Sequence, residues 1–265
     1  MRIVNWSKSY LLIASACFGV ILSSGETWFP QLMAPAVAQV EQSSTPLPIL
    51  WPSFEPGDRG SPSRRAGAGS RGGCLLGSPR LRALLPQETK SESPALTVDA
   101  NPVVFWAMPR IRKGAKVEFR LWDEADRRLY SKMLTVEEAG GIVSFRLPKS
   151  APNAELQADQ TYRWTVAVRC NPKLRDRSGD QFVEGWVKRV VPAPQLQQQL
   201  GAATNERDRA RAYAQAGIWH NTVELLVNLH RQHPETDSLA TTDWRKFLQS
   251  ADLEMLSEVD LLAEF

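Results

Sequence analysis

This chain of 265 residues has few of the side chains from which catalytic and metal sites are usually built. It contains three cysteines and three histidines, too few for the clustered Cys and His spacing of a structural zinc site. No nucleophile elbow, phosphate-binding glycine loop or H-E-x-x-H motif occurs in it. We therefore expect a protein that is not an enzyme and that holds neither a metal nor a cofactor.

The sequence also lacks a strong excess of charge of one sign. It carries 32 basic and 29 acidic residues, a formal net charge of +3. A dedicated nucleic-acid-binding protein has a much larger positive excess or a clear basic stripe. We therefore expect no nucleic acid among its partners. A hydrophobic content of 43% and a charged content of 23% are ordinary for a packed globular protein.

The apolar run at the N-terminus, residues 11–22, is too short to span a bilayer. Twelve helical residues cover roughly 18 Å, against a hydrocarbon core of roughly 30 Å. Because Arg2 and Lys8 precede the run, the layout is typical of a Sec-type signal peptide. Small residues suit cleavage near residue 25 or after Ala38, and we assign residues 1–38 to the signal peptide. The protein should then be periplasmic or secreted, with no stable membrane span. An uncleaved anchor and a lipoprotein acylated at Cys17 are the alternatives.

Export changes how the remaining cysteines are interpreted. Cleavage after residue 38 removes Cys17 and leaves Cys74 and Cys170. In an oxidising compartment, a lone pair of cysteines favours a disulfide over a redox or metal site. We therefore predict a Cys74–Cys170 disulfide, with two buried free thiols as the alternative.

Residues 39–73 have the composition of a disordered linker. Proline and glycine are frequent there, and little apolar side chain is available to offset the entropy of ordering. Arg64, Arg65 and Arg71 concentrate positive charge, which would suit contact with an anionic envelope polymer or with phosphate headgroups. A soluble tether that the charge keeps solvated is the alternative.

The hydrophobic pattern of residues 74–192 has a period of two, the period of half-buried strands. Six or seven short strands separated by turn residues are typical of an antiparallel β-sandwich of the immunoglobulin-like type. Residues 123–126 read as one of the hairpin turns. The runs lie at residues 103–108, 117–121, 128–136, 142–147, 162–170 and 182–191.

Tryptophans within these runs differ in phase. Trp106 and Trp164 share the phase of neighbouring aliphatic residues and should belong to the core. Trp122 is out of phase with Val117 and its apolar neighbours, so it should face outward. An outward aromatic ring on a sheet can stack against a sugar. Trp122 is therefore the candidate ligand-contacting residue of the sheet, whereas the phase of Trp186 is ambiguous.

After Pro192 the hydrophobic period becomes that of a helix, and we expect a helical hairpin domain over residues 193–265. Pro194 suits a first helical turn, Thr204 suits an N-cap, and Ser238 suits another. A short last helix is expected after Asp252. Residues 203–236 resemble a single tetratricopeptide repeat, which must pack on neighbouring elements because one repeat cannot bury its own face. The fold class is thus α+β, a β-sandwich followed by a tetratricopeptide-like hairpin.

The three histidines offer two pairs at helical spacing. His220 with Glu224, and His230 with His233, could each provide two metal ligands, but no third ligand lies at a sensible spacing. We expect all three histidines to be solvated on helix surfaces.

Several short motifs together resemble a family of secreted cyanobacterial proteins, the domain of unknown function 928. The resemblance covers residues 71 to about 250 and implies a cyanobacterial cell-envelope setting, without implying any activity or catalytic residue. The motifs are Arg71-Gly-Gly-Cys74, Leu81 to Pro86 (LRALLP), Gly141 to Pro148 (GIVSFRLP), Tyr162-Arg-Trp164, Cys170-Asn-Pro172, Phe182 to Trp186 (FVEGW) and Tyr213 to Trp219 (YAQAGIW).

Two hypotheses about function follow. The first is a non-enzymatic, exported protein–protein interaction module with an envelope protein as its partner. The second is a protein that binds carbohydrate or another envelope polymer through outward aromatic rings and the arginine-rich tether.

Overall fold

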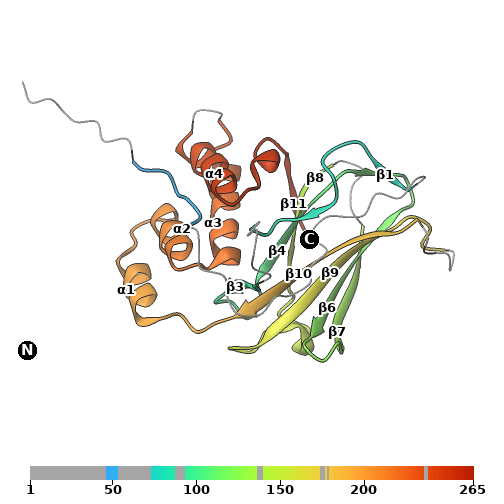
Figure 1. Ribbon diagram of the computed structural model, residues 1–265, viewed down its shortest axis with the longest axis horizontal. Coiled ribbons are helices and arrows are strands. Elements are labelled where there is room, and N and C mark those ends of the chain that lie inside the picture. The colour runs from blue at the N-terminus through green and yellow to red at the C-terminus, as the bar shows by residue number, and fades with distance from the viewer. Residues whose placement is uncertain are drawn as a thin grey trace, which may run out of the picture. The chain divides into compact units, whose positions relative to one another are not determined.

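The described residues form a mixed α/β structure with sheets and four α-helices, seen here in a computed structural model (Figure 1). The structure describes residues 46–52, 73–86, 93–135, 140–173, 177, 179–235 and 238–265. Residues Pro46–Phe265 belong to one compact unit. The signal peptide predicted at residues 1–38, and Arg64, Arg65 and Arg71, lie outside the described residues. The interpretations placed on them stay predictions.

The larger sheet has five strands and buries one of its faces. In spatial order they are β3 (Ala95–Thr97), β10 (Gln181–Arg189), β9 (Thr161–Arg169), β6 (Lys116–Asp123) and β7 (Arg128–Leu134). Neighbouring strands are antiparallel except for the parallel pair β3 and β10. Along β9, buried residues alternate with half-buried ones. This alternation is what the period-two pattern predicts for a sheet with one face on the core.

A second sheet of four strands packs against the buried face of the first. Its strands, in spatial order, are β11 (Leu261–Glu264), β8 (Gly141–Arg146), β4 (Val103–Met108) and β2 (Arg82–Ala83), and β1 (Leu75–Leu76) pairs separately with β5 (Arg110–Ile111). Phe119 of β6 and Phe145 of β8 meet between the two sheets with ring centroids 4.6 Å apart. Trp106 and Trp164 are fully buried, as predicted.

Helices follow the strands. They are α1 (Pro194–Ala202), α2 (Glu206–Gln215), α3 (Trp219–Gln232) and α4 (Leu239–Ser250), with short 3-10 turns at Pro152–Ala154 and Glu254–Leu256. Helix α3 joins the sheets through three consecutive residues. The Trp219 indole nitrogen donates to the Leu84 carbonyl at 2.9 Å, and His220 Nδ1 lies 3.0 Å from the Val103 carbonyl. Asn221 Oδ1 accepts from the Val98 backbone nitrogen at 3.1 Å. The helices and sheets therefore share one core.

Two details of the helical half differ from expectation. Asn205, and not Thr204, caps α2: its side chain accepts from the Asp208 backbone nitrogen at 2.9 Å. The predicted short last helix after Asp252 is a single 3-10 turn, and the chain then forms strand β11. Strand β11 runs parallel to β8, with Leu261 opposite Ile142. The C-terminal residues therefore form a strand because they pair with the edge of β8. Ser238 caps α4 as predicted.

The prediction of a disordered linker over residues 39–73 is wrong for residues 46–52. This segment lies on the helices, and Ile49 and Trp51 are buried in the main core. Its prolines suggested a loop, but two apolar side chains among them are sufficient to anchor it. The rest of the predicted linker up to residue 72 lies outside the described residues.

Candidate ligand-binding site

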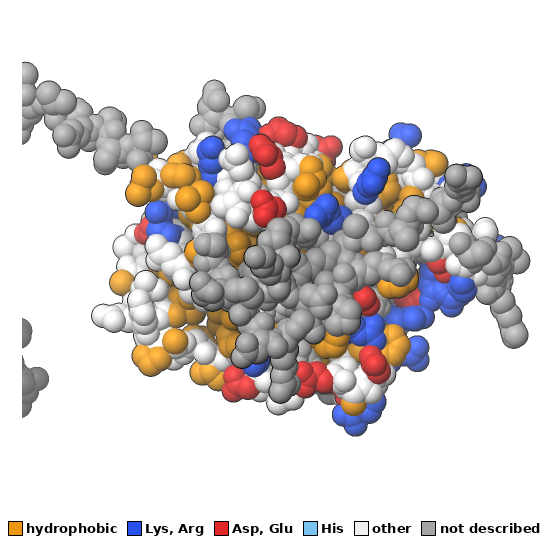
Figure 2. All heavy atoms as spheres, in the orientation of Figure 1, with side chains coloured by type: hydrophobic (Ala, Val, Ile, Leu, Met, Phe, Trp, Pro, Cys, Tyr) orange, Lys and Arg blue, Asp and Glu red, His pale blue; other side chains and the backbone are white. Residues whose placement is uncertain are grey.

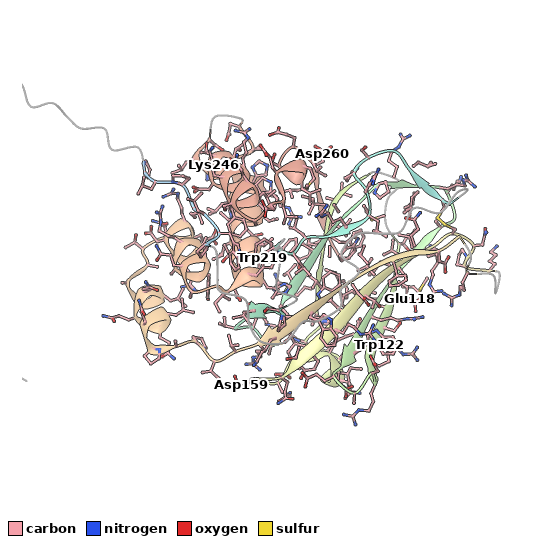
Figure 3. The ribbon with its side chains drawn as sticks, in the orientation of Figure 1. Glu118, Trp122, Asp159, Trp219, Lys246 and Asp260 are labelled. Carbon is pink, nitrogen blue, oxygen red and sulfur yellow. A yellow bond between two sulfur atoms is a disulfide. The ribbon has the colours of Figure 1, made fainter. Side chains whose placement is uncertain are left out.

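The face of the five-stranded sheet that points away from the core carries rows of polar and aromatic side chains. In one row, Trp122 of β6 lies opposite Arg163 of β9, which lies opposite Trp186 of β10. Figure 3 labels Glu118 and Trp122 along β6. The next two rows are Arg120, Thr165 and Glu184, and then Glu118, Ala167 and Phe182.

A hollow of about 680 Å³ lies over this face. Its lining includes the Trp122 and Phe182 rings and more positive than negative charge. Figure 2 shows basic and acidic side chains interspersed over this part of the molecule, at the lower right of the view. The charged lining residues are Arg120, Arg163, Arg169, Arg177, Asp180 and Glu184. Glu118 and Asp126 lie outside this lining and pair with three of the arginines, and the guanidinium groups keep further N–H donors for an anionic ligand.

Trp122 faces the hollow, as its phase predicted. The guanidinium carbon of Arg163 lies 5.2 Å from the ring centroid, and that of Arg120 lies 6.0 Å away. Both distances are within the range of cation–π contacts. Among the described residues, the buried indole nitrogen of Trp122 has no hydrogen-bond partner.

Ion pairs fix the arginines at the other end of the hollow. Glu118 accepts from Arg120 at 2.6 Å and from Arg169 Nε at 2.7 Å. Arg169 also donates to Asp180 at 3.1 Å. Burial acts to raise the pKa of Glu118, but hydrogen bonds from Arg169 and Arg120 outweigh it and hold that pKa below its usual value. The carboxylate therefore stays ionised and the two guanidinium groups stay oriented.

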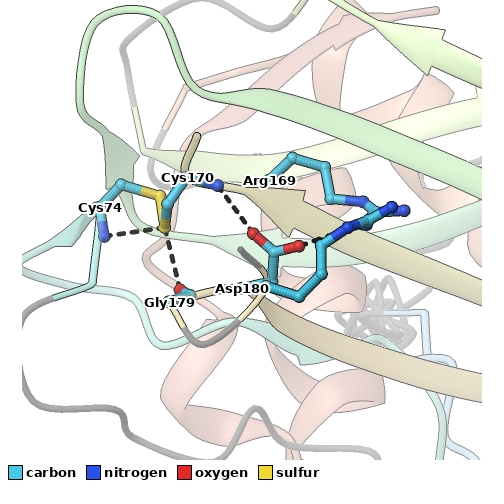
Figure 4. Close-up of a disulfide and its surroundings, with 6 residues drawn as sticks. Cys74, Arg169, Cys170, Gly179 and Asp180 are labelled. Atoms are coloured by element: carbon cyan, nitrogen blue, oxygen red, sulfur yellow. Dashed lines mark hydrogen bonds and ion pairs between the residues drawn. A yellow bond between two sulfur atoms is a disulfide. The ribbon is translucent and has the colours of Figure 1, made fainter. Parts of the chain in front are cut away.

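The predicted disulfide anchors the same end. Cys74 and Cys170 are joined in the structure, with Cα atoms 5.3 Å apart. Figure 4 shows Asp180 between the disulfide residue Cys170 and Arg169. One Asp180 oxygen accepts from the Cys170 backbone nitrogen at 3.0 Å, and the other accepts from Arg169. The disulfide thus holds the end of β9 from which Arg169 projects.

The predicted hairpin turn follows Trp122 directly and lies outside the lining of the hollow. Asp123 Oδ1 accepts from the backbone nitrogens of Ala125 at 3.0 Å and Arg127 at 2.9 Å. The backbone hydrogen bond from Arg127 is the main reason why the pKa of Asp123 is lowered. Asp126, at φ 57°, forms an ion pair of 2.6 Å with Arg163. The turn is therefore structural, and it positions Arg163 beside Trp122.

The prediction that the histidines are solvated is wrong for His220. Only 2% of this residue is exposed, because α3 lies directly on β4. Burial lowers the pKa of His220 to about 4, against a smaller opposing effect of the hydrogen bond with Val103. His230 is half-buried with its ring stacked on Trp244, and His233 is exposed as expected. No group of three or more His, Cys, Asp or Glu side chains in the described part of the chain is arranged to hold a metal ion.

Sequence reasoning identified Trp122 but missed the arginines around it. The signal was present in the pattern: Arg120 lies two residues from Trp122 in the same strand, and Arg163 and Arg169 share the outward phase of β9. What the pattern lacked was the register that brings these strands side by side. Over the described ranges, no helix is both long and apolar enough to cross a membrane.

None of the curated proteins matches this chain. A family model described as Domain of Unknown Function (DUF928) matches residues 66–261, which is more than half of the chain. The matched range contains both cysteines of the disulfide, every strand that lines the hollow and helices α1 to α4. The chain belongs to the DUF928 family.

Proposed function

We propose that this protein is an exported, non-enzymatic binding protein of the cell envelope, periplasmic or secreted, whose ligand is an anionic carbohydrate polymer. The Cys74–Cys170 disulfide supports an oxidising compartment. The signal-peptide pattern of residues 1–38 supports export. The family resemblance favours a cyanobacterial envelope as the setting.

The observation that carries the ligand class is the composition of the hollow on the five-stranded sheet. An aromatic ring flanked by fixed guanidinium groups offers both a stacking surface and charge-assisted hydrogen bonds. Carboxylated or sulfated sugars need both kinds of contact. Each guanidinium group has five N–H donors and its ion pairs use only some of them, so donors remain for the acidic groups of a sugar.

Binding of acidic and neutral polysaccharides, followed by calorimetry and on a glycan array, tests this proposal. The wild-type chain should bind acidic polysaccharide, with an affinity that falls as salt is raised. Trp122→Ala and Arg163→Gln should each weaken binding at least tenfold. Arg110→Gln removes an exposed arginine of β5, outside the hollow, and should leave binding unchanged. Equal binding by all four chains, or no binding by the folded wild type, would contradict the proposal.

Protein–protein interaction is the second candidate, favoured by a different observation. Helices α2 and α4 hold an extended segment, residues 46–52, through its backbone groups. Capture of an envelope protein that is lost when the exposed helical surface is changed, but kept in Trp122→Ala, would support this role.

The finer fold assignment is part of the same proposal. The two packed sheets are taken as an immunoglobulin-like sandwich, supported by strand order: β4, β6, β7, β8, β9 and β10 occupy positions equivalent to strands B, C, C′, E, F and G. Helices α2 and α3 are taken as one tetratricopeptide-like hairpin. Both architectures are common scaffolds for binding surfaces.

A further inference from the structure

Residues 46–52 lie on the helices as a bound peptide does. The helices contact the backbone of every second residue of this extended segment, at Leu47, Ile49 and Trp51. The hydrogen bonds run from Arg207 and Arg211 to the Leu47 carbonyl at 2.6 and 2.8 Å, from the Ile49 nitrogen to Asp243 at 2.9 Å, and from the Trp51 nitrogen to Ser250 at 2.7 Å.

Side chains of the segment divide into buried anchors and exposed spacers. Ile49 is 1% exposed and Trp51 is 8% exposed, whereas Leu47 and Leu50 are 75% and 51% exposed. The Trp51 ring meets the Trp219 ring edge-on at a centroid distance of 4.9 Å. Backbone hydrogen bonds combined with two apolar pockets are the usual basis of peptide recognition in an extended conformation.

The receiving surface is assembled by the helices themselves. Asp243 of α4 is fully buried, and both of its oxygens accept from Arg207 of α2, at 2.6 and 3.0 Å. The carboxylate therefore has its counter-charge without the segment, and it offers a further lone pair to the Ile49 nitrogen. Trp219 and Phe247 stack on each other at 5.1 Å and form the floor against which Trp51 packs.

Prolines at positions 46, 48 and 52 suit this mode of binding. Proline has no N–H group to leave unsatisfied, and it favours the extended conformation before binding occurs. The family match begins at residue 66 and contains helices α2 to α4, whereas residues 46–52 precede it. The match therefore covers the helices that form the groove and not the segment that lies on them.

We propose that helices α2, α3 and α4 form a peptide-binding groove, and that residues 46–52 are its built-in, exchangeable occupant. The partner is an extended, proline-flanked segment of another protein with an aliphatic and an aromatic residue two positions apart. This inference rests on the proposed role in protein–protein interaction and is independent of sugar binding at the sheet. When the tethered segment leaves, the partner segment takes the same contacts.

A fluorescent peptide spanning residues 44–54 is the probe, and the full chain is the receptor. Ile49→Ala combined with Trp51→Ala in the full chain empties the two pockets. This double variant should bind the peptide saturably, at least thirtyfold more tightly than the wild type does. In the wild type the tethered segment competes at an effective concentration in the millimolar range.

A peptide carrying the same two alanines should bind neither chain, and Ser250→Ala in the receptor should weaken binding severalfold. Equal binding to both chains, or no saturable binding to the folded double variant, would overturn the proposal.

A second version keeps every native contact and so avoids any folding defect of the double variant. A protease site is introduced within residues 57–64, and the folded chain is treated with the protease. The N-terminal fragment should co-elute with the body at micromolar concentration and should exchange with the labelled peptide while the far-ultraviolet circular dichroism stays constant. A fragment that exchanges only when the body unfolds is an ordinary part of the core, and the groove is then not a site. Partner capture and glycan binding by the intact chain are measured separately, so their failure is distinguishable from this one.

Discussion

The burial and the pKa of His220 in α3 are set by the strand that covers it and not by its position in the helix pattern. His220 lies on a helix whose pattern suggested an exposed side chain, yet its ring hydrogen-bonds to β4 at a residue 117 positions earlier. Nothing in the local sequence indicates which strand will cover it. Burial disfavours the charged form and keeps the ring neutral. Because a carbonyl oxygen can only accept, Nδ1 is the nitrogen that donates to Val103.

Stability should depend on pH through His220. Its folded-state pKa of about 4 lies below the ordinary value of 6.5, so the unfolded chain takes up a proton first as the pH falls. The neutral His220 ring contributes about 3 kcal/mol to the free energy of unfolding above about pH 6.5. This contribution is lost progressively as the pH falls toward 4. Urea unfolding at pH 7.5 and pH 4.5 measures this loss of stability.

In His220→Asn, whose amide keeps the hydrogen bond to Val103, this part of the pH dependence should vanish. His233→Asn, at an exposed site, should retain it. Identical pH profiles for the wild type and His220→Asn would contradict the assignment.

Gly185 is required by close packing. A Cβ atom at this position would lie 2.5 Å from Leu85 Cδ1 and 2.6 Å from Trp164 Cζ2, between the two sheets. Because the buried indole ring cannot retreat, Gly185→Ala should lower the free energy of unfolding by roughly 1–3 kcal/mol. Gly201→Ala is the matched control: no atom lies within 4 Å of its Cβ position, and it lies in α1, so the change should stabilise the chain by up to about 1 kcal/mol. Chemical denaturation of both variants checks the pair, and an unchanged midpoint for Gly185→Ala would show that the sheets can move apart.

At the scale of elements, the sequence predicts those strands that have one exposed face. Residues of β6, β9 and β10 alternate, and their predicted and observed bounds agree within a few residues. Strand β4 is buried at every position, because the other sheet covers one of its faces and α3 covers the other. Its continuous apolar run predicts a strand, but the run does not show that helices form a third layer. Strands β2 and β11 are short and depend on a partner edge distant in sequence. The candidate site shares this limit, since its arginines come together only through strand register.

The disulfide joins two elements that are otherwise weakly connected, the start of β1 and the end of β9. It closes a loop with a sequence separation of 96 residues. Cys74→Ser and Cys170→Ser should each destabilise the chain by about 2–5 kcal/mol, and the double variant by no more than either single one, because one bond is lost in every case. Urea unfolding with and without reductant measures this, and the reductant should have little effect on the three variants. Free thiols at both positions, mapped by alkylation of unreduced, exported protein, would contradict the prediction.

At the scale of the whole molecule, the helices and the sheets depend on each other. Asn221 of α3 accepts from the Thr97 hydroxyl and the Val98 nitrogen, and its amide donates to Asp99 at 2.8 Å. Arg146 of β8 pairs with Glu224 of α3 at 2.7 Å and with Glu264 of β11 at 3.0 Å. The chain therefore returns to the sheets after its helices, and the change of period at Pro192 marks a change of element type within one shared core.

This dependence predicts how the parts behave when they are separated. Residues 193–265 alone should show a helical circular dichroism spectrum of marginal stability, because the face of α3 that carries Trp219 and His220 has lost its cover. The full chain should unfold in one transition, with the helical signal at 222 nm and the tryptophan fluorescence changing together. Asn221→Ala should shift both signals by the same amount, since it weakens the contact between the halves. Two separate transitions in the wild type would show that the helices are a domain of their own, and a strand-dominated spectrum of the fragment would show that their structure is imposed by the sheets.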